Sequence, residues 1–352
     1  MNQLIIIEQY ELEKLLGIGS SGPVFLSNCK DDSKKYAIKR YERHLIEGKE
    51  IKNSIENELN FLQQIDHPNI IKLKDIKKSK RHFYIIYEYC NGGKLSDTLK
   101  KYIEKNSNTF PGEIIQHLMK QIIDVFKYLH ERKIIHRYIY SDSILLNYEN
   151  EKDAENLNLM KAQIKITKFK FACKVDKKFL KENIYHKNYP LGFSKRADIW
   201  SIGAICYKML IGNSFVDSKS ILEFFEKRNN YIPKTISFEI VSFINGMLQY
   251  KANKRLTAEQ LFRHDFLNRN VNTFKKINLD IDNFDEGKNL NDSNKITIWS
   301  IFNKKDEELL TSILGCDFVK PINENEKLEF SKKEEYSLKL SVNSIPGNPI
   351  DE

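Results

Sequence analysis

Apolar and polar residues alternate along the first hundred residues, and this alternation predicts strands. β-Branched and aromatic residues cluster in short runs bounded by glycine and polar residues, which is typical of half-buried strands. One segment breaks the pattern, because apolar residues between about Lys49 and Ile65 recur at helical spacing. The clearest strand runs are residues 23–26, 36–39 and 83–87.

The pattern becomes mostly helical from Glu113 onward. Apolar residues recur every three or four positions, which indicates amphipathic helices. A β-rich first part followed by a helical second part predicts an α+β fold with two lobes. The predicted helices of this second part cover residues 114–130, 199–210 and 222–227.

The chain changes composition again after Leu267. Residues 268–352 are rich in Asn, Lys, Asp and Glu and carry few apolar clusters, so we expect an extended docking segment that does not form a core of its own. One amphipathic helix is predicted from about Lys304 to Leu314. An apolar anchor precedes it, formed by Trp299, Ile301 and Phe302.

The net charge of +9 arises from 57 Lys and Arg against 48 Asp and Glu. Much of the excess lies between Lys165 and Lys187, which contains eight lysines and two acids. This stretch is either a solvated loop or a docking patch for an acidic protein partner, since clustered charge steers association. A nucleic-acid partner is not expected, because no motif of a nucleic-acid-binding fold accompanies the charge.

The five cysteines are scattered and form no C-x-x-C pair. This usage indicates a reducing compartment and excludes a disulfide framework and a zinc ribbon. No apolar run approaches the roughly 20 residues that span a bilayer, so no membrane span is expected. We therefore predict a cytoplasmic protein, either free or within a cytoskeletal or other large assembly, and no metal site.

A glycine-rich loop near the N-terminus has the form G-x-G-x-x-G-x-V. Its residues are Gly17, Gly19, Gly22 and Val24. The loop alone is a weak signal, shared with dinucleotide-binding folds. There the loop opens a helix, whereas here a predicted strand follows it and Lys39 lies in the next one. A phosphate-binding loop of the kinase type is therefore favoured over a dinucleotide site.

A second motif runs from His136 to Ser143 and reads H-R-Y-I-Y-S-D-S. Together with the glycine loop and Lys39, it resembles the eukaryotic protein kinases, whose catalytic loop has the form H-R-D-x-K-x-x-N. The calcium/calmodulin-dependent-like Ser/Thr kinases are the nearest branch. The resemblance covers about residues 10–267 and implies a bilobal kinase fold, with an N-lobe of about 10–90 and a C-lobe of about 91–267.

The resemblance also implies a nucleotide site between the lobes. Lys39 would contact the α- and β-phosphates, Glu58 would be its carboxylate partner, and bulky Tyr87 would close the back of the pocket. The carbonyl of Glu88 and the amide of Cys90 would face the adenine edge. The full expected set is Gly17, Gly19, Gly22, Val24, Ala37, Lys39, Glu58, Glu88, Cys90 and Leu145.

The residues that carry kinase chemistry are absent from their positions. Tyr138 replaces the Asp that accepts the substrate proton, and a phenol, with an ordinary pKa of about 10, is a poor acceptor at neutral pH. Ser143 replaces the magnesium-binding Asn, and Tyr140 replaces the loop lysine. Lys168 replaces the metal-binding Asp of the D-F-G motif, which removes the oxygen ligands that magnesium requires.

These replacements predict a pseudokinase that acts as a scaffold or assembly subunit for protein partners. ATP would bind without magnesium, if it binds at all. In one outcome Lys168 substitutes for the metal beside the phosphates, and in the other it pairs with Glu58 and leaves the site empty. Two alternatives stay open: an atypical Ser/Thr kinase or ATP-dependent transferase, and a nucleotide-sensing switch.

The residues that support the fold in this family are present. Leu62, Leu73, His136 and Phe169 fall at positions that stack between the lobes. Asp198 matches the helix residue that anchors the catalytic loop. A late arginine, Arg255, also matches, although its usual glutamate partner is not recognisable in the sequence.

Overall fold

The computed structural model describes residues 5–19, 22–46, 48–106, 110–175, 194–212, 235–249, 252–274 and 276–278. The fold, the candidate site and the contacts below lie within these ranges. Several predicted features fall outside them. These are the helix at residues 222–227, the second half of the lysine-rich stretch, and the tail from residue 279 on, with its anchor at 299–302 and its helix at 304–314.

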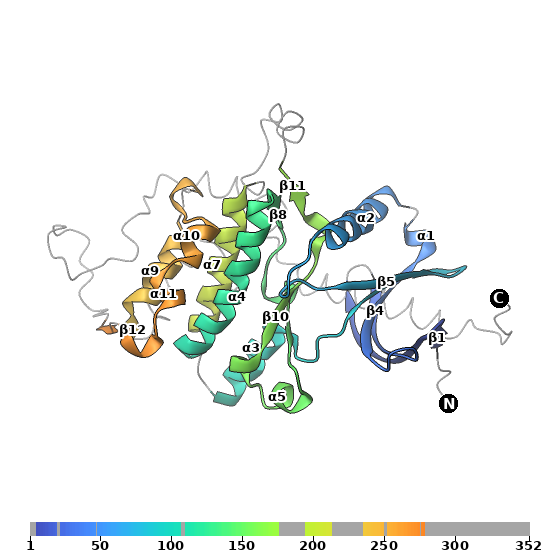
Figure 1. Ribbon diagram of the computed structural model, residues 1–352, viewed down its shortest axis with the longest axis horizontal. Helices are drawn as coiled ribbons and strands as arrows, with labels where there is room; N and C mark the ends of the chain where they lie inside the picture. The colour runs from blue at the N-terminus through green and yellow to red at the C-terminus, as the bar shows by residue number, and fades with distance from the viewer. Residues whose placement is uncertain are drawn as a thin grey trace, which may run out of the picture. The chain divides into compact units, whose positions relative to one another are not determined.

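A six-stranded antiparallel sheet forms the first part of the chain, in the order β1-β2-β3-β4-β6-β5 (Figure 1). The predicted strands at 23–26, 36–39 and 83–87 are confirmed. Alternation places Ile38, Ile85 and Ile86 fully inside, as expected for strands with buried faces. The strands are β1 (Ile5–Ile7), β2 (Tyr10–Gly19), β3 (Gly22–Cys29), β4 (Lys35–Glu42), β5 (Leu73–Lys78) and β6 (His82–Glu88).

A helix interrupts the sheet between β4 and β5, as the apolar spacing predicted. The short helix α1 (Arg43–Ile46) leads into α2 (Lys49–Gln64). Ile55, Glu58 and Leu62 are buried along one stripe of α2, which is the spacing of a helix that covers a core. That stripe packs on the one-turn helix η3 (Phe169–Phe171) from the second half of the chain.

Helices form most of the second part, where α4 and α7 run side by side (Figure 1). Nine residues of α4 are buried, and ten residues of α7 are buried while its other residues are half-buried, as expected for a helix that other elements surround. The helices are α4 (Gly112–Glu131), α5 (Glu151–Glu155), α7 (Lys195–Ile211), α9 (Phe238–Met247), α10 (Ala258–Phe262) and α11 (Asp265–Asn268).

One helix was missed in the part expected to be β-rich up to about residue 112. Helix α3 (Leu95–Asn106) begins directly after β7 (Gly93–Lys94). Leu95 and Leu99 are buried one turn apart, so the helical spacing was present in the sequence and was overlooked. The expected division into lobes at residues 90 and 91 stays a prediction.

Small sheets connect the helices and carry the candidate site. Strands β10 (Gln163–Ile166), β9 (Ile144–Asn147) and β7 form one sheet, and β11 (Cys173–Lys174) pairs with β8 (Ile134–Ile135). The last described strands, β12 (Thr235–Ser237) and β13 (Lys276–Asn278), pair with each other. Described structure therefore continues beyond Leu267. The fold is α+β, as predicted.

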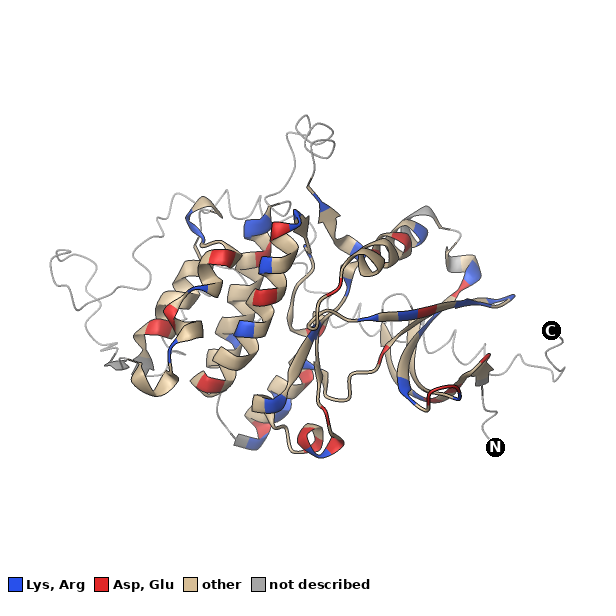
Figure 2. Cartoon of the chain, viewed as in Figure 1, with Lys and Arg blue, Asp and Glu red and all other residues tan. Residues whose placement is uncertain are grey.

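Charged residues are spread over both the sheet and the helices. Figure 2 shows basic and acidic positions interspersed on the strands and on the helices. The positive net charge of the chain therefore does not define one basic face in this view. None of the described helices is long and apolar enough to cross a membrane.

Candidate functional site

The glycine loop joins β2 to β3 as a hairpin. Gly17 lies opposite Val24 and Gly19 opposite Gly22 in the strand register. Gly22 has a φ of +132°, and a Cβ there would lie 2.1 Å from the Arg40 carbonyl oxygen. No other residue fits this position without moving the backbone. Of the three glycines, Gly22 is therefore the one that the local structure requires.

Register places the expected adenine-binding residues on adjoining strands. Val24 of β3 lies opposite Lys39 of β4, and Ala37 of β4 lies opposite Tyr87 of β6. Leu145 of β9 lies between Lys94 and Lys165 on its two neighbouring strands. The side chains expected to sandwich an adenine therefore come from two sheets. Val24 and Ala37 lie on the paired strands β3 and β4, and Leu145 lies on β9.

Glu58 is buried and Lys39 half-buried, and the two influence each other electrostatically. Burial lowers the pKa of Lys39 and raises that of Glu58, and the opposite charge of each counteracts the shift in the other. The two described side chains form no direct ion pair. The Lys39 ammonium instead lies 4.9 Å from the centre of the Tyr41 ring. The carboxylate of Glu58 also accepts the backbone N–H of Phe169.

Tyr87 occupies the back of the expected pocket and is 91% buried, with a relative exposure of 9%. Its hydroxyl has no hydrogen-bond partner among the described residues. Burial raises its pKa well above the usual value, and the nearby Glu58 carboxylate adds to the shift. The phenol therefore stays neutral and lies near Glu58, while its role in closing the pocket stays a prediction.

Glu88 pairs with Lys165, a lysine that the sequence analysis placed in the basic stretch of residues 165–187. The Lys165 ammonium lies 3.0 Å from the Glu88 carboxylate, whose other oxygen accepts the backbone N–H of Lys72. Lys165 is only 4% exposed. This lysine is therefore not part of a docking surface, which shortens the expected basic patch at its start. Next to this pair, burial raises the pKa of the Cys90 thiol to about 12.

The start of the catalytic loop is anchored by Asp198 from α7. This carboxylate is 1% exposed and accepts the backbone N–H groups of His136 and Arg137 at 3.0 and 2.8 Å. It also bonds the imidazole of His130 at 3.0 Å. Removing Asp198 would leave several buried donors unpaired. The anchoring role expected from the sequence fits this geometry.

His136 connects the loop to the segment around Phe169. Its Nδ1 accepts the backbone N–H of Tyr138, so Nε2 carries the proton and donates to the Thr167 carbonyl at 2.9 Å. Its ring meets the buried Phe169 ring edge-on at 4.8 Å. Burial lowers the pKa of His136. This histidine is a neutral packing and hydrogen-bonding group.

Lys168 makes its contacts with the two tyrosines of the catalytic loop. Its ammonium donates to the Tyr140 hydroxyl and lies 4.4 Å from the centre of that ring and 6.0 Å from the Tyr138 ring. Tyr138 and Tyr140 meet edge-on at 4.9 Å. Lys168 does not form a direct ion pair with Glu58 in the described part of the chain. Of the two outcomes left open for Lys168, the direct pairing with Glu58 is therefore not found, and the role beside bound phosphates stays a prediction.

The backbone of Lys168 is left-handed, with φ 67° and ψ 51°. This conformation costs a side-chain-bearing residue roughly 1–2 kcal/mol. Burial lowers the pKa of Lys168 to about 8, the neighbouring Asp142 opposes the shift, and Lys94, Lys170 and Lys39 reinforce it. Repelling lysines thus surround the position where the kinase motif has a metal-binding carboxylate.

Ser143 uses its hydroxyl within the catalytic loop itself. The hydroxyl donates to the Tyr140 carbonyl at 2.7 Å and accepts the Tyr140 backbone N–H at 3.0 Å. These bonds close the one-turn helix η1 (Ser141–Ser143), and the serine is fully buried. The position that holds magnesium in the kinase pattern therefore caps the loop backbone here.

Asn57 is a site residue that the sequence analysis missed. Its side-chain amide donates to the carbonyls of Lys170 and Ala172, both at 2.9 Å, and approaches that of Phe169 at 3.4 Å. Asn57 thus fastens α2 to the segment that carries Lys168. A polar residue within the partly buried stripe of an amphipathic helix was the available signal.

Arg255 has partners that the sequence did not reveal. Its guanidinium donates to the carbonyls of Gln249 and Arg196 at 2.7 and 2.8 Å. It also lies 4.7 Å from the centre of a Trp200 ring, and burial lowers its pKa to about 10. Carbonyl oxygens and an aromatic ring therefore support this arginine.

The described residues contain no group of three or more His, Cys, Asp and Glu that could hold a metal ion. In particular, the acids nearest to Lys168 belong to different places. Glu58 is buried on α2, and Asp142 lies in η1. Nothing in this arrangement presents paired carboxylate oxygens beside the expected phosphate position.

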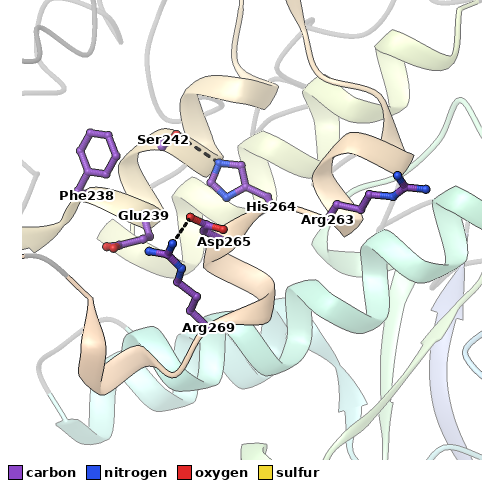
Figure 3. Close-up of a pocket in the computed structure, with 7 residues that line it drawn as sticks. All are labelled: Phe238, Glu239, Ser242, Arg263, His264, Asp265 and Arg269. Atoms are coloured by element: carbon purple, nitrogen blue, oxygen red, sulfur yellow. Dashed lines mark hydrogen bonds and ion pairs between the residues drawn. The ribbon is translucent and has the colours of Figure 1, made fainter.

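A separate pocket of about 360 Å³ lies among α9, α10 and α11 (Figure 3). Ser242 and His264 meet in it at 3.2 Å, a pair that resembles a nucleophile and its base. His264 Nδ1 accepts the Phe266 backbone N–H, so Nε2 carries the proton and cannot activate the serine. The lining residues are Phe238, Glu239, Ser242, Arg263, His264, Asp265 and Arg269.

Comparison with known proteins agrees with the geometry of the loop and its anchor. The protein kinase domain model matches residues 10–267. The chain is 29% identical over 267 residues to a probable serine/threonine-protein kinase, fhkC, of Dictyostelium discoideum, covering 73% of this chain and 44% of that protein. It is 25% identical over 266 residues to serine/threonine-protein kinase PLK4 of Drosophila virilis, covering 74% and 33%.

The chain spans less than half the length of these two relatives. The span matched by the family model nevertheless includes the glycine loop, the catalytic-loop segment and Asp198. The match of a family model to well over half of the residues shows the family without reference to catalytic activity. The chain belongs to the eukaryotic protein kinase superfamily.

Proposed function

We propose that this protein is a kinase-fold scaffold or assembly subunit that binds protein partners and does not transfer phosphate. Phosphoryl transfer needs a base for the attacking hydroxyl and oxygen ligands for magnesium. The general base alone contributes about 10² to 10⁴-fold to rate. The positions that supply these groups in the family hold Tyr138, Ser143 and Lys168.

The observation that carries the proposal is the contact of Lys168 with Tyr140. The ammonium binds the tyrosine hydroxyl and lies over its ring. Magnesium would have to approach a cation there in place of a carboxylate, and Coulomb repulsion opposes this. Ser143 offers no substitute, because its hydroxyl already caps the loop. Loss of metal and base together disables the usual reaction route.

ATP binding is a second, separable part of the proposal. Val24, Ala37 and Leu145 provide apolar faces on paired strands, and Lys39 offers a cation for phosphates. The bulky side chain of Tyr87 would reduce the depth of the adenine pocket. We expect weak binding that does not require magnesium, with Lys168 acting in place of the metal.

A product assay tests the absence of phosphoryl transfer. The chain would be incubated with γ-labelled ATP and magnesium and with generic protein substrates, beside Lys39→Ala and Tyr138→Asp. No label above the Lys39→Ala background is expected, and Tyr138→Asp alone should recover none, because the metal ligands stay absent. Label that depends on Lys39 would support the atypical-kinase alternative and refute the scaffold proposal.

Two further measurements separate scaffold from switch and examine the tail. A nucleotide that alters partner binding would favour a nucleotide-sensing switch. Co-purification followed by mass spectrometry would identify the partner and any cytoskeletal or other cytoplasmic assembly. Truncation after Asn278 keeps the β12–β13 pair. This truncation should abolish partner binding if the tail docks, and unchanged binding would refute that role.

A further inference from the structure

Four lysines from three parts of the chain converge around the catalytic loop. Lys39 belongs to β4, Lys94 to β7, and Lys168 and Lys170 to the segment at η3. Each of the other three lowers the pKa of Lys168 by its positive charge. We call these four residues the lysine cluster. The Lys168 and Lys170 ammonium groups lie 6.0 and 5.4 Å from the centre of the same Tyr138 ring, so positive charge is concentrated beside the catalytic loop.

Glu58 and Asp142 offset part of the charge of the lysine cluster through space. Neither Lys168 nor Lys170 forms an ion pair with an acid in the described ranges. Asp142 and Glu58 act on Lys168 or are acted on by it at longer range. Burial raises the pKa of Glu58, which further disfavours its charged form. An anionic ligand would relieve the remaining repulsion.

Aromatic rings form one side of the lysine cluster. The Tyr138 ring lies 4.8 Å from Phe171, and the Lys170 ammonium lies 5.4 Å from Tyr138 and 4.8 Å from Phe171. Phe171 is 40% exposed despite its size. Exposed apolar surface beside unpaired cations suits a ligand that has both an anionic group and carbon atoms.

The charge pattern favours a phosphate group that carries no metal. Nucleotide triphosphates normally enter kinase sites with magnesium, which needs carboxylate ligands. A phosphorylated side chain carries a charge of about −1.5 to −2 and three acceptor oxygens without a metal. Lys94 is exposed and Lys170 is half-buried, so a group attached to another protein can reach the cluster from the side of Lys94.

We propose that the lysine cluster, with Tyr138 and Phe171, binds a phosphorylated serine or threonine side chain of a protein partner. The former site of phosphate transfer would thus recognise the product of another kinase. This inference rests on the proposed function, because it requires that the site binds partners and no longer holds magnesium. It adds the chemical class of the partner.

Fluorescence anisotropy on the full chain tests the inference. The probes are two labelled peptide libraries with random flanks, one with a central phosphoserine or phosphothreonine and one with the unmodified residue. Magnesium is present throughout. The phosphorylated library should bind, and the unmodified library should not. Lys168→Gln and Lys170→Gln should each weaken binding about tenfold or more, since each removes a charge-assisted hydrogen bond.

Lys174→Gln is the matched control, because Lys174 is an exposed lysine of the same segment, in β11. Its effect should stay within about twofold. Equal binding of both libraries, or equal losses in all three variants, would overturn the inference. ATP in EDTA that binds through Lys168 while the phosphorylated library does not would also overturn it.

A product assay on the same preparation distinguishes failure of the proposed function from failure of the phosphopeptide inference. Phosphoryl transfer that depends on Lys39 would refute the proposed function itself. Absence of both transfer and phosphopeptide binding would refute only the phosphopeptide inference. Thermal unfolding of each variant confirms that the compared proteins are folded.

Discussion

The two ends of the catalytic loop differ in what holds their side chains. At the anchoring end, Asp198 accepts hydrogen bonds from His136, Arg137 and His130, and all of these groups are structural in role. At the other end, Lys168 contacts Tyr140 and Tyr138. The first end keeps the residue types of the kinase pattern, and the second end has lost them.

The difference follows from what each position contributes. Asp198 satisfies buried donors that exist in any protein with this backbone, so replacing it would leave those donors unpaired. The catalytic Asp residues bind groups that arrive from outside, namely a metal and a hydroxyl. At the corresponding positions of this chain, Lys168, Tyr140 and Tyr138 contact one another. The anchoring contacts of the loop therefore do not depend on which residues occupy the catalytic positions.

The largest effect is expected at the anchoring end. Asp198→Ala should lower the free energy of unfolding by about 3–5 kcal/mol, because a buried, hydrogen-bonded carboxylate is removed. Asp66→Ala is the control, since its side chain is 90% exposed, and should change stability by less than about 1 kcal/mol. Chemical denaturation measures both. Equal effects would show that Asp198 does not anchor the loop.

A smaller effect is expected where α2 meets the Lys168 segment. Asn57→Ala removes the bonds to Lys170 and Ala172 and should destabilise the protein by about 1–3 kcal/mol, leaving buried carbonyls unpaired. Hydrogen exchange should accelerate at residues 169–172. Asn53→Ala is the matched control, because Asn53 is exposed one turn earlier in α2. If both variants accelerate hydrogen exchange equally, Asn57 does not specifically fasten α2 to the Lys168 segment.

The smallest effect is a pH dependence at the replaced end. The pKa of Lys168 is about 8 when folded and ordinarily 10.5, so the unfolded chain binds the proton more tightly. The resulting cost is fully present below pH 8 and disappears as pH rises from about 8 to 10.5. Wild type should therefore gain stability over Lys168→Met in that window, by less than about 1 kcal/mol after solvent screening.

Unfolding curves at several pH values measure this difference, with Lys174→Met as the control that should follow wild type. A stability difference that stays constant from pH 7 to pH 10, or that moves in the opposite direction, would contradict the burial of a charged Lys168. Other groups titrate in the same range, but they are common to both proteins and cancel in the difference.

Much of the fold could be predicted from periodicity. The strands at 23–26, 36–39 and 83–87 and the helices α2, α4 and α7 follow from alternation and from helical spacing. Helix α3 was missed because a β-rich lobe was expected there, although its apolar residues recur at helical spacing. Short strands such as β8 and β11 were not specified, since their pairing depends on residues distant in the sequence.

The candidate site could be predicted by position but not by contact. The sequence identified Lys168 as the replacement of a metal ligand and left two roles open for it, but neither included the observed contact with Tyr140. Lys165 looked like part of a basic surface and is buried against Glu88. Such contacts arise from strand register and loop geometry, which residue types alone do not determine. The roles in nucleotide binding stay predictions.

The magnesium dependence of nucleotide binding tests most directly whether the replaced end has lost its metal chemistry. Thermal shift with ATP would be measured in EDTA and in magnesium, on wild type and on Lys168→Ala. The account predicts that magnesium adds no stabilisation to wild type beyond that in EDTA, whether ATP binds weakly or not at all. A shift that requires magnesium and survives Lys168→Ala would contradict it.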